Sequence, residues 1–168
     1  MSIIEIEEIS LASDLSHFPF LVEALKCWEH WCDGAQAPRW SAIDMVDLPP
    51  RLIPSTIVVD VVDGGRDLEF RFWGSAMVDL YGAELTGKFY SDATDTLFGA
   101  LPHAQYQKII DTRIPGLYRV TIRRPNNMIA ERLNLRLPIV DEQGNVSKVM
   151  TIVQIHLHKA NEMTTPGN

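Results

Sequence analysis

The first regular pattern of hydrophobic positions along the chain has the period of an α-helix. In the segment FPFLVEALKCWEHWCDG, Leu21, Leu25 and Trp28 share one face, and Trp31 broadens it. A proline near the start and a glycine at the end suit the first turn and the stop of a helix. A helical face with two tryptophans must be covered, either by the rest of the chain or by a second copy of it.

Strand-like patterns follow a proline-punctuated connector, AQAPRWSAIDMVDLPPRLIP. STIVVDVVD is β-branched and apolar on both faces, which predicts an interior strand. LEFRFWG alternates, so we expect Leu68, Phe70 and Phe72 on one face and Trp73 on the other. Residues 75–114 have the pattern of helices and loops, so a helical middle is expected after the first two strands.

The stretch GLYRVTIRRPNNMIAERLNLRLPIV predicts a β-hairpin with the two asparagines of PNNM in its turn, because asparagine tolerates positive φ. In this register Tyr118 faces Leu135 on the apolar face. Arg124 and Glu131 fall on the same face as near-diagonal neighbours that can pair. The opposite face then collects four arginines: Arg119, Arg123, Arg132 and Arg136.

This four-arginine face has more than one interpretation. It suits docking of an acidic protein or an anionic ligand, because guanidinium groups bind carboxylates and phosphates. It can also be solvated, or covered by the acidic N-terminal segment that holds Glu5, Glu7 and Glu8. We favour an intramolecular or dimer role, since these charges complement one another within one chain.

The order of elements predicts an α+β fold. A last strand, KVMTIVQIHLH, completes a five-stranded antiparallel sheet with helices on one face. Residues 1–52 are expected to form an N-terminal helical extension and the proline-rich connector. Residues 53–158 form the core, and residues 159–168 a frayed tail.

Charge and composition exclude several classes of protein. The 168 residues carry a net charge of −7. Residues 1–100 hold 6 Lys or Arg against 17 Asp or Glu, which argues against nucleic-acid binding. No apolar run approaches the roughly 18 residues of a membrane span. The acidic N-terminus is unlike a secretory signal, so we expect a cytoplasmic protein.

The stretch GAELTGK matches the spacing of a phosphate-binding loop. The hydroxyl that such a loop needs after its lysine is replaced by Phe89. The loop also needs a strand before it, whereas Met77, Val78 and Tyr81 have helical spacing. ATP binding is therefore not expected.

With the same stretch at its centre, the order of elements resembles a PAS domain. More narrowly, it resembles the bacterial single-domain PAS family formerly catalogued as a domain of unknown function. The match covers residues 20–158, with Ser75 where threonine is usual. The matching positions are Trp28 and Trp31, Pro38–Arg39, Leu48–Pro49 with Leu52 and Pro54, Arg71 with Gly74, Gly82 to Lys88, Glu131–Arg132, and Leu135 to Pro138. The resemblance implies that Gly82 and Gly87 serve backbone conformation rather than phosphate binding.

The cofactor is unknown, and flavin, haem and metals are not expected. Neither Cys27 nor Cys32 lies in the helical middle, where flavin photosensors of this fold carry a reactive cysteine, and their spacing suits no zinc site. Both suit apolar packing. Haem-binding members of this fold use a helix histidine as axial ligand, and His103 is the only histidine between the two sets of strands. It suits a surface or capping role better. His156 and His158 lack an evident third metal ligand.

PAS folds often enclose a small-molecule pocket, so aromatic and polar residues of the expected core are pocket candidates. They are Phe70, Phe72, Met77, Tyr81, Phe89, Tyr106, Tyr118, Arg124, Glu131 and Leu133. The same aromatics can equally form a plain core. An isomerase- or hydratase-like enzyme of cone-shaped α+β fold is an alternative, in which Glu131 would be the pocket carboxylate. A ligand-free structural adaptor is another.

The function indicated is a sensory or protein-interaction module without an output domain. It is expected to have no catalytic residues and to signal through a protein partner or through homodimerisation. The interface candidates are Leu21, Leu25, Trp28, Trp31 and the four-arginine face. A ligand or partner would shift the packing of the tryptophan-bearing helix on the sheet, as a population shift.

Overall fold

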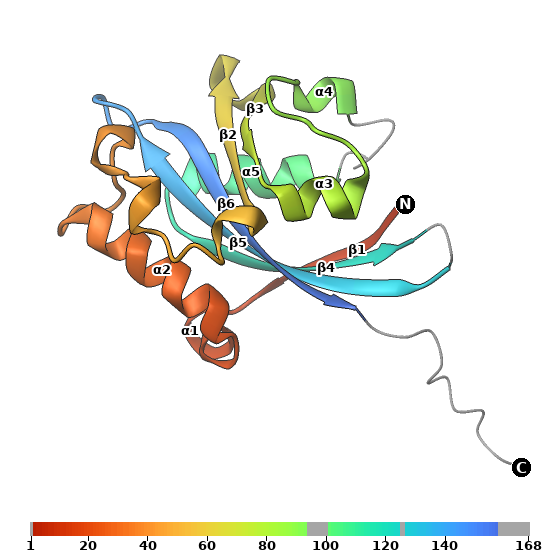
Figure 1. Ribbon diagram of the computed structural model, residues 1–168. Coiled ribbons are helices and arrows are strands. Elements are labelled where there is room, and N and C mark those ends of the chain that lie inside the picture. Colours follow the sequence, from red (N-terminus) through yellow and green to blue (C-terminus); the bar gives the residue numbers. More distant parts are fainter. Residues whose placement is uncertain (1, 94–100, 125–126, 158–168) are drawn as a thin grey trace, which may run out of the picture.

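The alternating and β-branched segments form one antiparallel sheet of six strands (Figure 1). The computed structural model describes residues 2–93, 101–124 and 127–157. The strand order is β1-β4-β5-β6-β2-β3, and every neighbouring pair is antiparallel. The strands are β1 (Ser2–Ile9), β2 (Thr56–Val62), β3 (Asp67–Trp73), β4 (Gly116–Arg123), β5 (Ile129–Val140) and β6 (Val146–Leu157).

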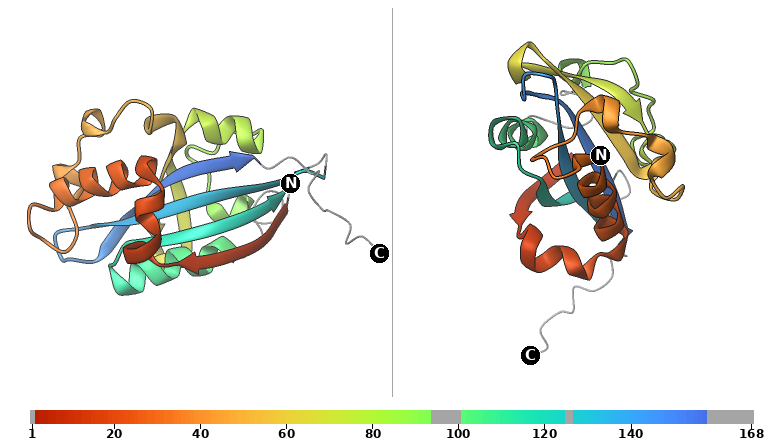
Figure 2. Two further views of the ribbon diagram at one scale, coloured as in Figure 1. Left: turned by 90° about the horizontal axis from the view of Figure 1, so that it is seen from below. Right: turned by 90° about the vertical axis from the view of Figure 1, so that its left-hand side faces the viewer.

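Helices cover both faces of this sheet. The longest, α2, packs on one face, and α5 lies on the other (Figure 2). The helices are α1 (Leu11–Asp14), α2 (Pro19–Cys32), α3 (Ser75–Tyr81), α4 (Tyr90–Ala93) and α5 (Leu101–Thr112). The connector contains the 3-10 turns η2 (Trp40–Ala42), η3 (Met45–Asp47) and η4 (Ile53–Ser55). Two strands, a helical middle and three strands follow the extension, so the expected α+β, PAS-like fold is confirmed.

The N-terminal extension differs from the expected one, because its first element is a strand. β1 adds a sixth strand at the sheet edge beside β4, with Ile6 opposite Val120. Glu7 lies opposite Arg119 and its carboxylate accepts a hydrogen bond from the guanidinium at 3.0 Å. The acidic segment therefore pairs with part of the arginine set within one chain. Its mostly exposed, irregular pattern of isoleucines and glutamates hid the strand from periodicity analysis.

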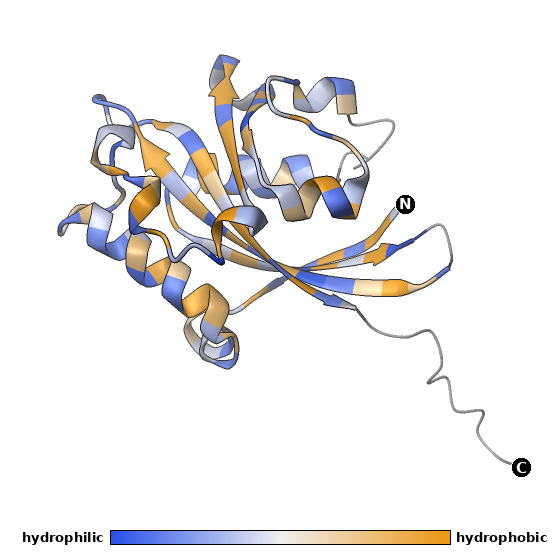
Figure 3. Ribbon diagram, in the orientation of Figure 1, coloured by the Kyte–Doolittle hydropathy of each residue, from blue (hydrophilic) through white to orange (hydrophobic). Residues whose placement is uncertain are grey.

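The apolar face of α2 is covered by the chain's own sheet. Leu21 is fully buried, and Trp28 and Trp31 are nearly so, in a cluster with Leu133 and Leu135 of β5. The indole of Trp28 donates a hydrogen bond to the Pro138 carbonyl at 2.9 Å. Figure 3 shows hydrophobic residues interspersed with hydrophilic ones along the strands. Where both faces of the sheet are covered, apolar side chains lie on both, as Val58 on the α2 side and Val59 on the α5 side of β2 do. Of the two coverings that the sequence allowed, the intramolecular one is present.

Replacing Trp28 with phenylalanine should lower the free energy of unfolding by about 1 kcal/mol. The ring stays in the core, but the buried carbonyl of Pro138 loses its indole donor. Urea denaturation followed by circular dichroism measures the change. An unchanged midpoint would mean that the hydrogen bond contributes nothing to stability.

The β4–β5 hairpin has a register one residue away from the expected one. Tyr118 lies opposite Asn134, not Leu135. Three residues connect Arg124 to Met128, and Asn127 has the left-handed φ of 60° that closes such a loop. A slip of one residue exchanges the faces of one arm relative to the other. The four-arginine face therefore does not exist: the pair on β4 lies on the α2 side, and Arg132 and Arg136 lie on the α5 side.

A β-bulge in β3 also changes which side chains share a face. Phe72 and Phe70 pair with the consecutive residues Val58 and Val59, so one residue between them is extra. Phe72 therefore packs on the α2 side, whereas Phe70 and Trp73 both face α5. The expectation that Phe70 and Phe72 share a face is wrong for this reason.

The expected frayed tail, residues 159–168, lies outside the described residues. Within the described ranges, no helix has the length and apolar character needed to cross a membrane.

Candidate ligand-binding site

A small cavity lies between the sheet and the helices of the chain's middle. Half of its described lining residues are aromatic, and three polar side chains of β5 reach it from the sheet. Its volume is about 20 Å³, which is room for about one water molecule. The lining residues are Ile57, Phe70, Trp73, Tyr81, Tyr90, Pro102, Tyr106, Arg132, Asn134 and Arg136.

The alternation of β5 places the polar side chains in this cavity. In the segment RLNLR, Arg132, Asn134 and Arg136 point one way, and the leucines between them pack under α2. The three polar residues are 4%, 3% and 2% exposed. A polar strand face normally meets water, but here helices cover it. Burying two guanidinium groups is costly unless each is paired and hydrogen-bonded.

Arg136 connects the sheet to α5. Its Nε and Nη2 donate to Gln105 Oε1 at 3.2 and 3.1 Å, and its Nη1 donates to Thr151 Oγ1 of β6 at 3.0 Å. The guanidinium carbon lies 3.8 Å from the ring centre of Tyr106, as in a cation–π contact. Neutral oxygens and aromatic rings thus surround this charge.

Replacing Gln105 with alanine should lower the free energy of unfolding by about 1.5 kcal/mol. The buried guanidinium of Arg136 would lose the acceptor of two of its hydrogen bonds. Gln107→Ala on the same helix is the matched control, because that amide bonds only to the exposed Asp111. Thermal denaturation of both variants measures the difference. Equal losses in the two would contradict a special role of the Arg136–Gln105 contact.

Arg132 is less well satisfied than Arg136. Its guanidinium carbon lies 5.1 Å from the ring centre of Tyr81, and its Nε is buried without a hydrogen-bond partner among the described residues. Oδ1 of Asn134, another cavity residue, is also buried and unpartnered. Burial, and then the charge of Arg136, lower the pKa of Arg132 to about 9. Arg132 is therefore still a cation at neutral pH.

The GAELTGK stretch braces the aromatic wall. The indole of Trp73 donates to the Ala83 carbonyl at 2.9 Å. The amide of Gly87 donates to the Phe70 carbonyl at 2.7 Å, which docks the stretch on the edge strand β3. Gly82 ends α3 with a φ of 71°, and Gly87 has a φ of 78°. The expectation that these glycines serve backbone conformation is confirmed.

Half of the predicted pocket residues lie on the cavity side of the sheet. These are Phe70, Met77, Tyr81, Tyr106 and Tyr118. The others do not: Phe72 and Leu133 pack on the α2 side, and Phe89 is 38% exposed. Glu131 precedes Arg132 on β5 and so faces the α2 side. Arg124 lies half-buried at the end of the hairpin arm.

The sequence analysis missed the polar part of the cavity. Arg132 and Arg136 were expected on the four-arginine face rather than in a pocket, and Asn134, Trp73 and Tyr90 were not named as pocket candidates. The alternating letters RLNLR show a polar strand face, but a periodic pattern does not say which face the helices cover. Trp73 faces the cavity only because the bulge in β3 shifts the alternation of its side chains.

Neither cysteine is in a reactive setting. Both are free, and Cys32 is buried in the α2 cluster. Burial, and then the charge of Glu29, raise the pKa of the Cys32 thiol to about 11. Burial also raises the pKa of Cys27. The sequence analysis predicted that both cysteines pack as apolar residues, and thiols with raised pKa values react slowly.

His103 and His156 each have a hydrogen-bond partner. Nε2 of His103 donates to the Gly65 carbonyl at 2.9 Å, which ties α5 to the β2–β3 turn. His156 lies 3.0 Å from the Gln154 amide, and His158 is outside the described residues. Among the described residues, no three His, Cys, Asp or Glu side chains are grouped to hold a metal ion.

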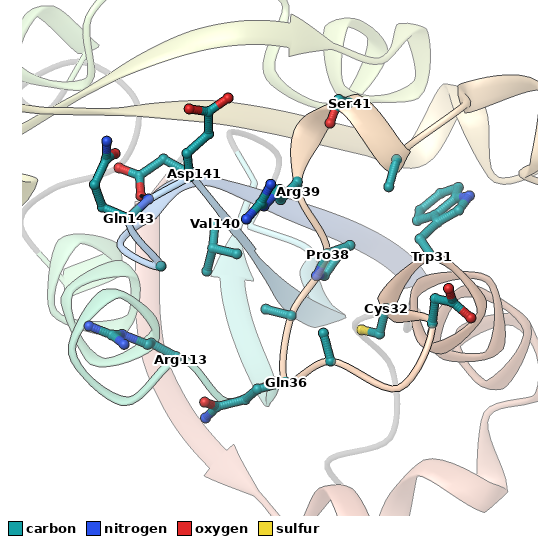
Figure 4. A pocket seen from close by; sticks show the side chains of 16 residues that line it. Trp31, Cys32, Gln36, Pro38, Arg39, Ser41, Arg113, Val140, Asp141 and Gln143 are labelled. Carbon is teal, nitrogen blue, oxygen red and sulfur yellow. Dashed lines mark hydrogen bonds between the residues drawn. The ribbon is translucent and has the colours of Figure 1, made fainter.

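A larger hollow is an open surface groove of about 670 Å³ between the end of α2 and the β5–β6 turn (Figure 4). Two residues of its lining, Val140 and Asp141, have structural roles. Val140 donates its amide to the Pro38 carbonyl at 2.9 Å, which docks the connector on β5. The Asp141 carboxylate accepts from the amides of Gln143 and Asn145, both at 2.9 Å, and closes the turn. The small cavity, not this groove, contains the unpartnered polar atoms of Arg132 and Asn134.

No protein-family model matches the chain, and no curated protein matches it either. Solved structures that it resembles include the light-state LOV domain of the blue-light photoreceptor Aureochrome1, at 10% identity and a TM-score of 0.45, covering 66% of this chain and 88% of that one. An RNA-binding Light-Oxygen-Voltage receptor matches at 12% identity and a TM-score of 0.41, covering 67% of this chain and 35% of that one. A fungal LOV domain photoreceptor matches at 12% identity and a TM-score of 0.44, covering 85% of this chain and 98% of that one. At these values the likeness says nothing of a ligand or an activity.

Proposed function

We propose that this protein is a PAS-type sensory module that binds a small molecule in the cavity between its sheet and α5. The observation that carries the proposal is a small cavity in which Nε of Arg132 and Oδ1 of Asn134 are buried without a hydrogen-bond partner among the described residues. A domain with a purely structural core would gain stability from apolar residues at these positions. We place the protein in the bacterial cytoplasm.

The contacts of Arg136 supply a route for the signal. This side chain holds Gln105 of α5 and Thr151 of β6 at once. The next residue of β6, Ile152, packs in the cluster under α2 on the other face. An occupant that draws the guanidinium away from Gln105 would loosen α5 and shift the packing of both helices. The size of that shift is limited by the difference in ligand affinity between the two states.

We propose binding rather than catalysis. The described residues that line the cavity include no carboxylate and no histidine, the usual general acids and bases. Glu131, the carboxylate on which an isomerase or hydratase mechanism would depend, faces the other side of the sheet. A structural adaptor differs from a sensor in keeping this cavity empty of any ligand.

The signal is proposed to pass to a protein partner or through a homodimer. Leu21, Trp28 and Trp31 are buried within the chain, so such a contact needs another surface or a movement of α2. Leu25 is half-buried beside them. Deleting residues 1–35 would uncover the apolar sheet face, so the whole chain is the right material for the test.

Native mass spectrometry of the whole protein, repeated under denaturing conditions, tests the proposal. We expect a reproducible extra mass below that of a nucleotide, which is lost on denaturation. Hydrogen exchange before and after removal of this cargo should show a change in α2 and α5. A protein that carries no cargo and whose exchange is unaffected by any added compound is an adaptor.

A further inference from the structure

The charges around the cavity differ from those elsewhere in the chain. The ion-paired arginines among the described residues are exposed or half-buried and have carboxylate partners; they are Arg51, Arg66, Arg71 and Arg119. Arg132 and Arg136 are the most buried, yet no described carboxylate contacts either of them. Two cations in an apolar enclosure repel each other and attract an anion.

The unpartnered atoms define the hydrogen bonds that an occupant would complete. Nε of Arg132 is a donor and needs an acceptor. Oδ1 of Asn134 is an acceptor and needs a donor. A halide or a simple carboxylate supplies only acceptors. A molecule with a carboxylate and a neighbouring hydroxyl supplies both, and its carboxylate matches the fork of a guanidinium.

The dimensions of the cavity limit the size of the molecule. A volume of about 20 Å³ leaves no room for a long chain or a ring. The guanidinium groups now lie against the rings of Tyr81 and Tyr106. As it stands the cavity holds about one water molecule, so a molecule of two or three carbon atoms enters only if these side chains turn away from the rings to make room.

We propose that the cavity binds a small hydroxycarboxylate, with its carboxylate on Arg132 and Arg136 and its hydroxyl donating to Asn134. This inference rests on the proposed sensory function and names the class of its ligand. Sodium glycolate is the probe, and sodium acetate tests the hydroxyl. Neutral glycolamide tests the charge, and sodium chloride at the same concentration controls for ionic strength.

The test is titration calorimetry together with the ¹H–¹⁵N spectrum of the arginine Nε–H groups. We expect glycolate to bind and to shift the Arg132 resonance, which is identified by its loss in Arg132→Met. That variant should bind glycolate roughly tenfold to a hundredfold more weakly, the cost of a charge-assisted hydrogen bond. Acetate should bind more weakly than glycolate, and glycolamide not at all. Arg119→Met, which removes an arginine that pairs with Glu7, should bind like the wild type.

Two results overturn the inference. The first is an equal response of the protein to chloride and to glycolate. The second is the absence of any difference in glycolate binding between the wild type and Arg132→Met, whether both bind it or neither does. A neutral cargo found by native mass spectrometry would leave the sensory function standing and refute the hydroxycarboxylate. Glycolate bound at Arg132 without any change in hydrogen exchange of α2 and α5 would establish the site and refute the sensory role.

Discussion

Replacing Gly74 with alanine is expected to lower the free energy of unfolding by about 3–5 kcal/mol. A Cβ atom at this position would lie 2.1 Å from the Pro54 carbonyl oxygen and 2.6 Å from its carbon. Both are backbone atoms, so no side-chain rotation can relieve the clash. The backbone of Gly74 is ordinary, with φ −63° and ψ 152°, so space alone requires the glycine.

The clash lies where the connector meets the wall of the cavity. The amide of Gly74 donates to the Thr56 carbonyl at 2.9 Å, and its own carbonyl accepts from Met77 at the start of α3. Pushing these elements apart would move Trp73 and Met77, which pack beside the cavity. We therefore expect Gly74→Ala to lose ligand binding together with stability.

Gly82→Ala is the control for this prediction, because its glycine is required for the opposite reason. Gly82 has a φ of 71°, but an added Cβ would meet no atom within 4 Å. Its cost is the strain of the left-handed conformation, about 1 kcal/mol. Urea denaturation of both variants gives the comparison. A Gly74→Ala protein within 1 kcal/mol of the wild type would mean that the contact with the connector is loose.

Replacing Arg132 with methionine is expected to raise the free energy of unfolding by about 2–4 kcal/mol. The change removes a buried cation that no described carboxylate neutralises and keeps an unbranched side chain of similar reach. The same change is expected to weaken anion binding. Stability and ligand binding would then move in opposite directions, as at many functional sites.

The gain from Arg132→Met should depend on pH. The folded state holds the Arg132 proton with a pKa of about 9, well below the ordinary pKa of arginine in the unfolded chain. Between these values the unfolded wild type binds more protons than the folded one, so its stability rises with pH relative to the variant. The advantage of the variant is therefore full below pH 9 and shrinks above it. Tyrosines such as Tyr90 and Tyr118, whose pKa values burial raises, remain in both proteins and cancel in the difference.

Denaturant titrations of wild type and Arg132→Met at pH 7, 9 and 10.5 measure both effects. Arg119→Met serves as control, because it removes a half-exposed arginine with a carboxylate partner and should change stability by less than about 1 kcal/mol. A destabilised Arg132→Met protein would show that the contact with Tyr81 outweighs the cost of burying the charge.

Local patterns in the sequence were sufficient for most elements. The helix with Leu21 and Trp28 was predicted because its apolar residues repeat at the period of one helical face, and the structure buries that face. The glycines of GAELTGK were recognised because the stretch follows a helix and lacks the hydroxyl of a phosphate loop. Both conclusions rest on neighbours in sequence, where spacing alone carries the information.

The hairpin shows where such reasoning fails. The pattern around PNNM is compatible with a two-residue and a three-residue turn, and the choice between them moves every side chain of β5 to the other face relative to β4. The left-handed conformation of Asn127 belongs to the longer loop. The bulge in β3, opposite Val58 and Val59, likewise moves the side chain of Trp73 to the other face of the sheet.

The sequence by itself determined the α+β class, the order of the core elements and the conformational role of Gly82 and Gly87. It did not determine that Arg132 and Arg136 are buried together, because their alternation with leucine is the same whether the polar face meets water or a helix. Only the tertiary structure decided this, when α5 packed over that face and α2 over the other. The cost of enclosing two cations is a property of the packed layers, and no spacing along the chain records it.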